Sequence, residues 1–86
     1  MEAKRGSMNI FIYTKSSCPN CVAAKKLLKS KGLEYEERDI EHVSWRNRLL
    51  SVHPDVKQMP FITINGQRVG GLAGLQAALK QLEGQS

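Results

Sequence analysis

The sequence predicts a single α/β domain in which about three helices cover a four-stranded mixed sheet. Three observations support this fold class. The chain has 86 residues, which is enough for one hydrophobic core and too few for two. Its composition, with 41% hydrophobic and 24% charged residues, is typical of a folded globular protein. Strand-like and helix-like segments follow one another in the order β-α-β-α-β-β-α, and right-handed crossovers then place the first two strands parallel.

The first segments of the chain predict a buried strand followed by a helix. Residues 9–14 form a β-branched and aromatic run that is apolar almost throughout, which is typical of a strand buried on both faces. After a short turn, residues 19–31 have the apolar spacing of a helix, and Gly32 is a suitable residue for its C-terminal end. The apolar residues expected on the inward face of this helix are Val22, Leu27 and Leu28.

The next two segments predict a peripheral strand and a second helix. Residues 33–40 alternate apolar with charged side chains, which predicts a strand close to an edge of the sheet. Residues 44–52 predict a helix that Pro54 closes. The residues expected to pack from this helix, at helical spacing, are Trp45, Leu49 and Val52.

The last third of the chain predicts a hairpin and a final helix. The two strands of the hairpin are joined by Asn65-Gly66, a strong signal for a two-residue turn. Gly70-Gly71 then breaks the second strand. Four leucines recur on one face of the final helix, which predicts that this face belongs to the core. In chain order these segments are strand 61–64, strand 67–69, and a helix that contains Leu72, Leu75, Leu79 and Leu82 and ends at Gly84.

The charge and hydropathy of the chain argue against several classes of protein. Thirteen Lys and Arg residues against eight Asp and Glu residues give a net charge of +5, but the basic residues are scattered rather than massed as in a nucleic-acid-binding patch. The apolar runs are too short to span a membrane, and no signal-peptide core precedes the first strand. We interpret residues 1–7 as a disordered start or tag remnant and residues 8–86 as the folded domain.

The two cysteines, Cys18 and Cys21, are only three positions apart. Cysteines that staple small secreted proteins are spread out to close long loops, so this pair indicates reactive chemistry in a reducing compartment, and we expect a cytoplasmic protein. Cys18 stands where the first helix begins, and Pro19 suits its first turn. The unpaired N–H groups and the positive dipole end of the helix favour a thiolate, so the pKa of Cys18 is expected below about 8.5.

Cys21 lies one helical turn further along, on the same face as Cys18. This spacing allows a disulfide to open and close with little backbone motion. We therefore predict that Cys18 is the exposed, attacking sulfur and that Cys21 is the shielded, resolving sulfur. A zinc site would need His42 and His53 as further ligands, but their spacing is not that of a usual zinc motif. A purely structural disulfide would constrain the unfolded chain little, because the ring it closes is so small.

Several motifs of the sequence resemble those of bacterial glutaredoxins. In chain order they are Ile12-Tyr13-Thr14-Lys15, Cys18-Pro19-Asn20-Cys21, Ala24-Lys25, Leu27-Leu28, Lys31-Gly32, Met59-Pro60-Phe61 and Val69-Gly70-Gly71. The similarity covers residues 8–82, nearly the whole domain. The resemblance implies a thioredoxin-like three-layer fold and an enzyme that exchanges thiols and disulfides. It also implies glutathione as the co-substrate that recharges the dithiol, with no permanently bound cofactor and no metal.

The resemblance further implies which residues bind the substrate. Pro60 is expected to be cis and to lie opposite Cys18, where the backbone of Met59 pairs with glutathione or with an extended protein substrate. Lys15 matches a family lysine that meets a glutathione carboxylate. The residues expected to bind glutathione or substrate are Lys15, Pro19, Asn20, Met59, Pro60, Gly70, Gly71, Leu72 and Ala73. The expected partners are glutathione and disulfide-containing or glutathionylated proteins, and the expected oligomeric state is a monomer.

The sequence departs from the family pattern at two places. Asn20 stands where the family usually has an aromatic residue that lines the glutathione groove. Ala73 and Gly74 stand where an Asp usually follows the glycine pair and meets the amino group of glutathione. A Gly74→Asp substitution is therefore expected to tighten the glutathione mixed disulfide.

Two alternative functions remain open from the sequence. A glutaredoxin-like hydrogen donor for ribonucleotide reductase would be recharged by thioredoxin reductase, and such redoxins also lack part of the glutathione groove. An iron–sulfur carrier would bridge two subunits through the first cysteine of each, here Cys18, together with glutathione. Pro19 stiffens the turn beside Cys18 and argues mildly against the carrier.

Overall fold

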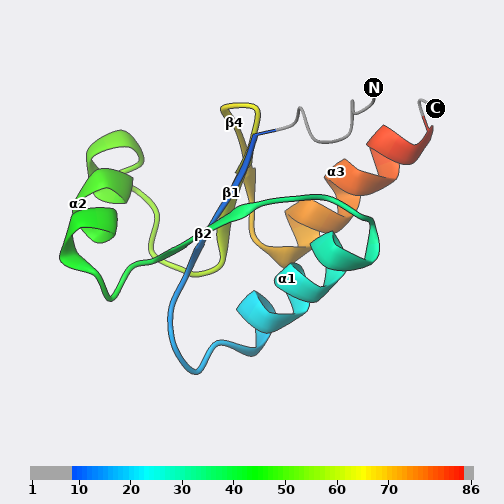
Figure 1. Cartoon of the computed structure of the whole chain (residues 1–86). Helices are drawn as coiled ribbons and strands as arrows, with labels where there is room; N and C mark the ends of the chain where they lie inside the picture. The colour runs from blue at the N-terminus through cyan, green and yellow to red at the C-terminus, as the bar shows by residue number, and fades with distance from the viewer. Residues whose placement is uncertain (1–8, 85–86) are drawn as a thin grey trace.

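The computed structural model describes residues 9–84, which form a four-stranded sheet between two layers of helices (Figure 1). The elements are β1 (Ile10–Thr14), α1 (Pro19–Ser30), β2 (Glu36–Asp39), α2 (Val43–Val52), β3 (Phe61–Ile64), β4 (Gln67–Gly70) and α3 (Leu72–Gly84). Their order confirms the predicted β-α-β-α-β-β-α arrangement. The start or tag remnant expected at residues 1–7 lies outside the described residues.

The sheet is mixed, with the strand order β2-β1-β3-β4. Strand β1 runs parallel to β2 and antiparallel to β3, and β4 pairs antiparallel with β3. The turn between β3 and β4 has positive φ angles at Asn65 (53°) and Gly66 (81°), as the predicted two-residue turn requires. The two central strands are β1 and β3. Strand β1 ends shortly before the dithiol, and strand β3 begins directly after Met59-Pro60.

The second strand is shorter than residues 33–40, the span predicted from the sequence, because β2 begins only at Glu36. Gly32 has a φ of 72°, and the N–H of Leu33 donates to the carbonyl of Leu28 over 3.1 Å. This hydrogen bond turns the chain back against the end of α1. The first residues of the predicted strand therefore serve as the connection after the helix.

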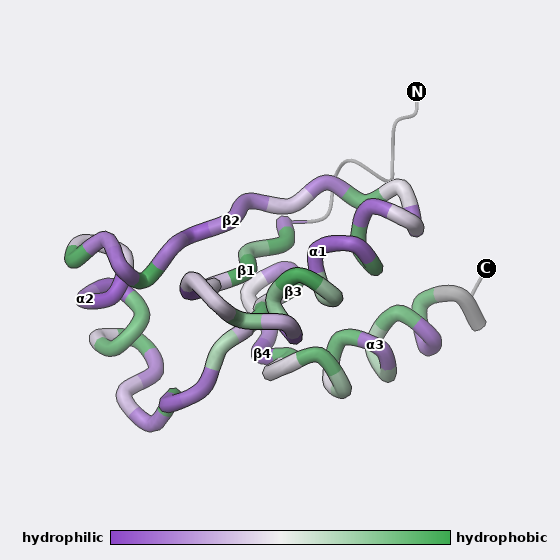
Figure 2. Tube along the Cα trace, turned by 90° about the horizontal axis from the view of Figure 1, so that it is seen from below, coloured by the Kyte–Doolittle hydropathy of each residue, from purple (hydrophilic) through white to green (hydrophobic). Residues whose placement is uncertain are grey.

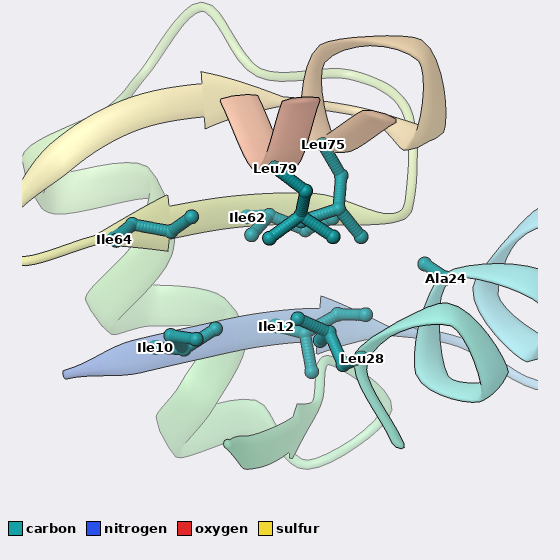
Figure 3. Packing of buried hydrophobic residues seen from close by; sticks show 8 residues of the cluster. All are labelled: Ile10, Ile12, Ala24, Leu28, Ile62, Ile64, Leu75 and Leu79. Carbon is teal, nitrogen blue, oxygen red and sulfur yellow. The ribbon is translucent and has the colours of Figure 1, made fainter. Parts of the chain in front are cut away.

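The main core lies between the sheet and the layer formed by α1 and α3, where residues of β1 and β3 meet residues of both helices (Figure 3). Its buried members are Ile10, Ile12, Ala24, Leu28, Ile62, Ile64, Leu75 and Leu79. A smaller cluster on the α2 face of the sheet consists of Tyr13, Leu49, Val56 and Phe61. Both faces of the central strands are thus buried, as predicted for residues 9–14.

Three apolar side chains expected in the core are instead exposed: Val22 (48%), Val52 (64%) and Leu82 (39%). The buried residues of α1 are Cys21, Ala24 and Leu28. Val22 is about 100° around the helix from Cys21, so it lies off that stripe. At the end of α2 the ring of His53, rather than Val52, packs on Phe61, with ring centroids 4.8 Å apart. Leu82 lies one turn beyond the part of α3 that contributes to the main core.

Strand β2 is hydrophilic along most of its length and forms one edge of the sheet (Figure 2). Its Arg38 guanidinium lies 4.0 Å from the ring centroid of Phe11 and 4.5 Å from that of Trp45. Arg38 also donates a hydrogen bond of 2.9 Å to the hydroxyl of Tyr13. Because Trp45 belongs to α2, this cation–π stack attaches α2 to the β1–β2 side of the sheet.

Candidate active site

The dithiol lies at the start of α1, directly after the central strand β1. Cys18 is the N-cap residue of α1 and has extended backbone angles, and Pro19 is the first helical residue. The backbone N–H of Cys21 donates to Sγ of Cys18 over 3.2 Å. Cys18 and Cys21 form a disulfide, with their Cα atoms 5.2 Å apart. The helix therefore directs an N–H donor at the sulfur of Cys18, as the sequence predicted.

The two cysteine residues differ in their access to solvent, although less than expected. Cys18 is 9% exposed and Cys21 is 2% exposed. Cys18 is thus the more accessible cysteine, but it is a buried residue and not an openly exposed one. The reason is the neighbouring segment, because Sγ of Cys18 lies 3.6 Å from the carbonyl oxygen of Met59. The Met59–Pro60 peptide bond is cis, as the resemblance implied.

A groove of about 510 Å³ extends from Met59-Pro60 along the turn between β4 and α3. It brings together most of the residues expected to bind glutathione: Asn20, Met59, Pro60, Gly70, Gly71, Leu72 and Ala73. Gly70 has a φ of 99°, a conformation that favours glycine, and it bends the chain from β4 into α3. The volume of the groove lies in the range of small-molecule sites.

Lys15, in the turn before the dithiol, and Pro19, the first residue of α1, are not among the residues that line this groove. Lys15 is exposed in that turn, and Ser17 has a positive φ of 56°. Both the N–H and the hydroxyl of Ser16 donate to the carboxylate of Glu41. These hydrogen bonds lower the pKa of Glu41 and tie the turn to the segment between β2 and α2. Glu41 is a supporting residue that the sequence motifs did not indicate.

Sequence reasoning also missed three charged residues of the groove: Asp55, Lys57 and Arg68. Arg68 donates to both carboxylate oxygens of Asp55, over 3.1 and 2.6 Å. These hydrogen bonds lower the pKa of Asp55. Asp55 lies in the loop before β3 and Arg68 lies on β4. No local pattern predicts such a pair, because the fold alone brings the two segments together.

A zinc site at the two cysteines would need further ligands close to them. In the part of the chain that the structure describes, residues 9–84, no three His, Cys, Asp or Glu side chains gather as a metal site would require. His42 instead precedes α2 as its N-cap residue, and His53 follows it. Over the same residues, no helix is long and apolar enough to cross a membrane.

Comparisons with known proteins agree with this geometry. The family model for glutaredoxin matches residues 10–69, which is more than half of the chain. The chain belongs to the glutaredoxin family. Glutaredoxin 3 of Escherichia coli (strain K12) is 36% identical to it over 69 residues, which cover 80% of this chain and 83% of that protein.

Two solved structures resemble this glutaredoxin over most of its length. The solution structure of glutaredoxin from Brucella melitensis is 35% identical, with a TM-score of 0.67, and the match covers 88% of this chain and 84% of that one. The crystal structure of the thioredoxin-like protein BC3987 is 38% identical, with a TM-score of 0.73, and the match covers 85% of this chain and 97% of that one. The fold is therefore thioredoxin-like, and the family is one of thiol–disulfide oxidoreductases.

One expectation about this glutaredoxin is wrong, namely that position 74 can accept the missing Asp. A Cβ atom on Gly74 would lie 2.1 Å from the carbonyl oxygen of Val69. Helix α3 approaches β4 too closely there for any side chain. Ala73, which is exposed and lines the groove, is the position where an acidic side chain fits.

Because α3 approaches β4 closely at Gly74, we expect a side chain at this position to lower the stability of the protein. Gly74→Ala should destabilise the protein by about 1–3 kcal/mol, because the backbone of Val69 must move to admit the methyl group. Urea unfolding followed by circular dichroism measures this change. Ala73→Gly, at the adjacent helical position, controls for helix propensity and should cost at most about 1 kcal/mol. A Gly74→Ala variant as stable as the parent would contradict the contact with Val69.

Proposed function

We propose that this glutaredoxin reduces protein disulfides and glutathione mixed disulfides through Cys18, and that glutathione recharges it. The observation that carries the proposal is the position of the Cys18 sulfur. It receives the N–H of Cys21 and lies beside Met59, which lines a groove together with most of the residues that the family resemblance singled out. We further propose that the protein acts as a monomer in the cytoplasm.

The reaction begins at Cys18 because its sulfur is the one stabilised as a thiolate. The N–H of Cys21 and the positive end of the α1 dipole both favour negative charge at this sulfur. The thiolate attacks one sulfur of the substrate disulfide, forms a mixed disulfide and releases the other sulfur as a thiolate. The backbone of Met59 and the groove hold the substrate extended during this step.

Cys21 completes the reduction. Its sulfur is within disulfide reach of Cys18, so its thiolate displaces the reduced substrate and forms the Cys18–Cys21 disulfide. One glutathione thiolate then attacks Sγ of Cys18 and frees Cys21. A second glutathione attacks the glutathione sulfur of this adduct, which releases oxidised glutathione and restores the dithiol. The two electrons that reduce the substrate thus come from two glutathione molecules.

The alternative reductant is thioredoxin reductase, as in the hydrogen donors of ribonucleotide reductase. The absence of an acid at Ala73 and Gly74 favours it, because the amino group of glutathione lacks its usual partner there. Two coupled assays on the same disulfide substrate separate the two reductants. We expect turnover with glutathione and glutathione reductase, and little turnover with thioredoxin reductase. Fast turnover with thioredoxin reductase and none with glutathione would reject the proposal.

A further inference from the structure

The lining of the groove includes a charged pair, Asp55 and Arg68, that the proposed chemistry does not use. Arg68 and Asp55 are held together by two hydrogen bonds, yet their side chains remain 48% and 63% exposed. The guanidinium of Arg68 also lies over Phe61, 5.3 Å from the ring centroid. Both residues line the same groove as Met59 and Ala73. A ligand that begins at Cys18 and follows the groove can therefore reach this pair.

The pair has spare capacity for hydrogen bonds. A guanidinium has five N–H donors, and Arg68 uses only its two terminal nitrogens toward Asp55. A carboxylate accepts at about four lone-pair positions, and Arg68 occupies one at each oxygen of Asp55. A ligand with an ammonium beside a carboxylate can add to both partners without breaking the pair. The ammonium would donate to Asp55, and the carboxylate would accept from Arg68.

We propose that Asp55 and Arg68 bind the zwitterionic α-amino-acid end of the γ-glutamyl group of glutathione. This inference rests on the proposed function, in which glutathione is the reductant. In that group the ammonium and the carboxylate are attached to one carbon, so they arrive together and match the two charges of the pair. Lys57, which also lines the groove, adds a second positive charge for the carboxylate. Asp55 thus supplies, from the loop before β3, the acid that is missing at Ala73.

A purely structural role for the pair makes a different prediction. The pair joins the loop before β3 to β4, and this loop leads into Met59. If it only held Met59 in place, its loss would weaken every thiol ligand of Cys18 to the same extent. Recognition of the zwitterion requires that the loss depend on the charges of the ligand.

The test uses the Cys21→Ser variant, in which Cys18 is the remaining thiol. It measures the equilibrium in which Cys18 forms a mixed disulfide with each small thiol, starting from the symmetric disulfide of that thiol. The three thiols are glutathione, a des-amino analogue (glutaryl-cysteinylglycine) and a des-carboxy analogue (4-aminobutanoyl-cysteinylglycine). Asp55→Asn should weaken the glutathione adduct about three- to tenfold and leave the des-amino adduct unchanged, because that analogue has no ammonium. Arg68→Gln should weaken the glutathione adduct and leave the des-carboxy adduct unchanged.

A matched control removes the exposed carboxylate of an ion pair far from the groove. Glu36 pairs with Arg38 over 3.0 Å on the opposite edge strand, and Glu36→Gln should change none of the three equilibria. Equal weakening of all three adducts by Asp55→Asn, or no weakening at all, would overturn the inference and leave the proposed function intact. Failure of glutathione to form any adduct with the parent would overturn both.

Discussion

Cys18→Ser should abolish disulfide reduction and remove the one thiol that ionises well below a pKa of about 8.5. The sulfur of Cys18 accepts the N–H of Cys21 at the start of α1, and both this donor and the helix dipole favour the thiolate. Cys21 is 2% exposed and lies within the first turn, so neither solvent nor the helix end stabilises its thiolate in the same way. Thiolate absorbance, titrated against pH in the reduced protein, measures the difference.

Cys21→Ser is the matched control for this experiment. It should keep the low-pKa signal and the ability to form a mixed disulfide, and it should lose only the intramolecular resolving step. If the low-pKa signal instead survived in Cys18→Ser and vanished in Cys21→Ser, the roles of the two sulfurs would be reversed.

Ala73→Asp should strengthen the glutathione mixed disulfide, by up to about 3 kcal/mol or roughly a hundredfold. Ala73 is exposed, lines the groove and has room for a longer side chain, in contrast to Gly74. The new carboxylate would meet the ammonium of glutathione close to the turn at Gly70-Gly71. The ammonium of glutathione would then bind the new carboxylate at position 73 in place of Asp55. In the Ala73→Asp variant, Asp55→Asn should therefore weaken the glutathione adduct less.

The measurement for Ala73→Asp is again the equilibrium between glutathione and the Cys21→Ser variant. Gln76→Asp is the control, because it adds the same charge to an exposed position of α3 outside the groove. Both variants should unfold at the same urea concentration within error. An Ala73→Asp variant that binds glutathione no better than the control would show that the γ-glutamyl group does not reach this side of the groove.

Local sequence signals predicted the elements that place the dithiol. The β-branched run before Lys15 predicted strand β1, and the proline after Cys18 predicted the start of α1. The Asn65-Gly66 pair predicted the turn between β3 and β4. All three predictions are confirmed. The β-α-β-α-β-β-α order then determined the sheet through the handedness of its crossovers. These features depend on residues that are close together in the chain, so the sequence alone was enough to predict them.

Features that depend on packing between distant segments were not predictable in this way. The spacing of apolar residues predicted that Val22 and Val52 are buried, but both are exposed. Apolar spacing does not show how much of a helix surface is covered by the rest of the protein. The contact between Gly74 and Val69 depends on how closely α3 approaches β4. The pair formed by Asp55 and Arg68 joins a loop to a strand across the hairpin, and neither residue belongs to a recognisable motif.

We propose that glutathione reduces this protein by attacking Cys18. This reaction is tested most directly by exposing the oxidised protein to glutathione, trapping with acid, and mapping the adduct by peptide mass spectrometry. We expect a glutathione adduct on Cys18 that forms early and disappears as oxidised glutathione accumulates, with Cys21 free in the same molecules. Attack by glutathione at Cys18 would be contradicted by an adduct on Cys21. It would also be contradicted by a Cys18–Cys21 disulfide that glutathione leaves intact while thioredoxin reductase reduces it rapidly.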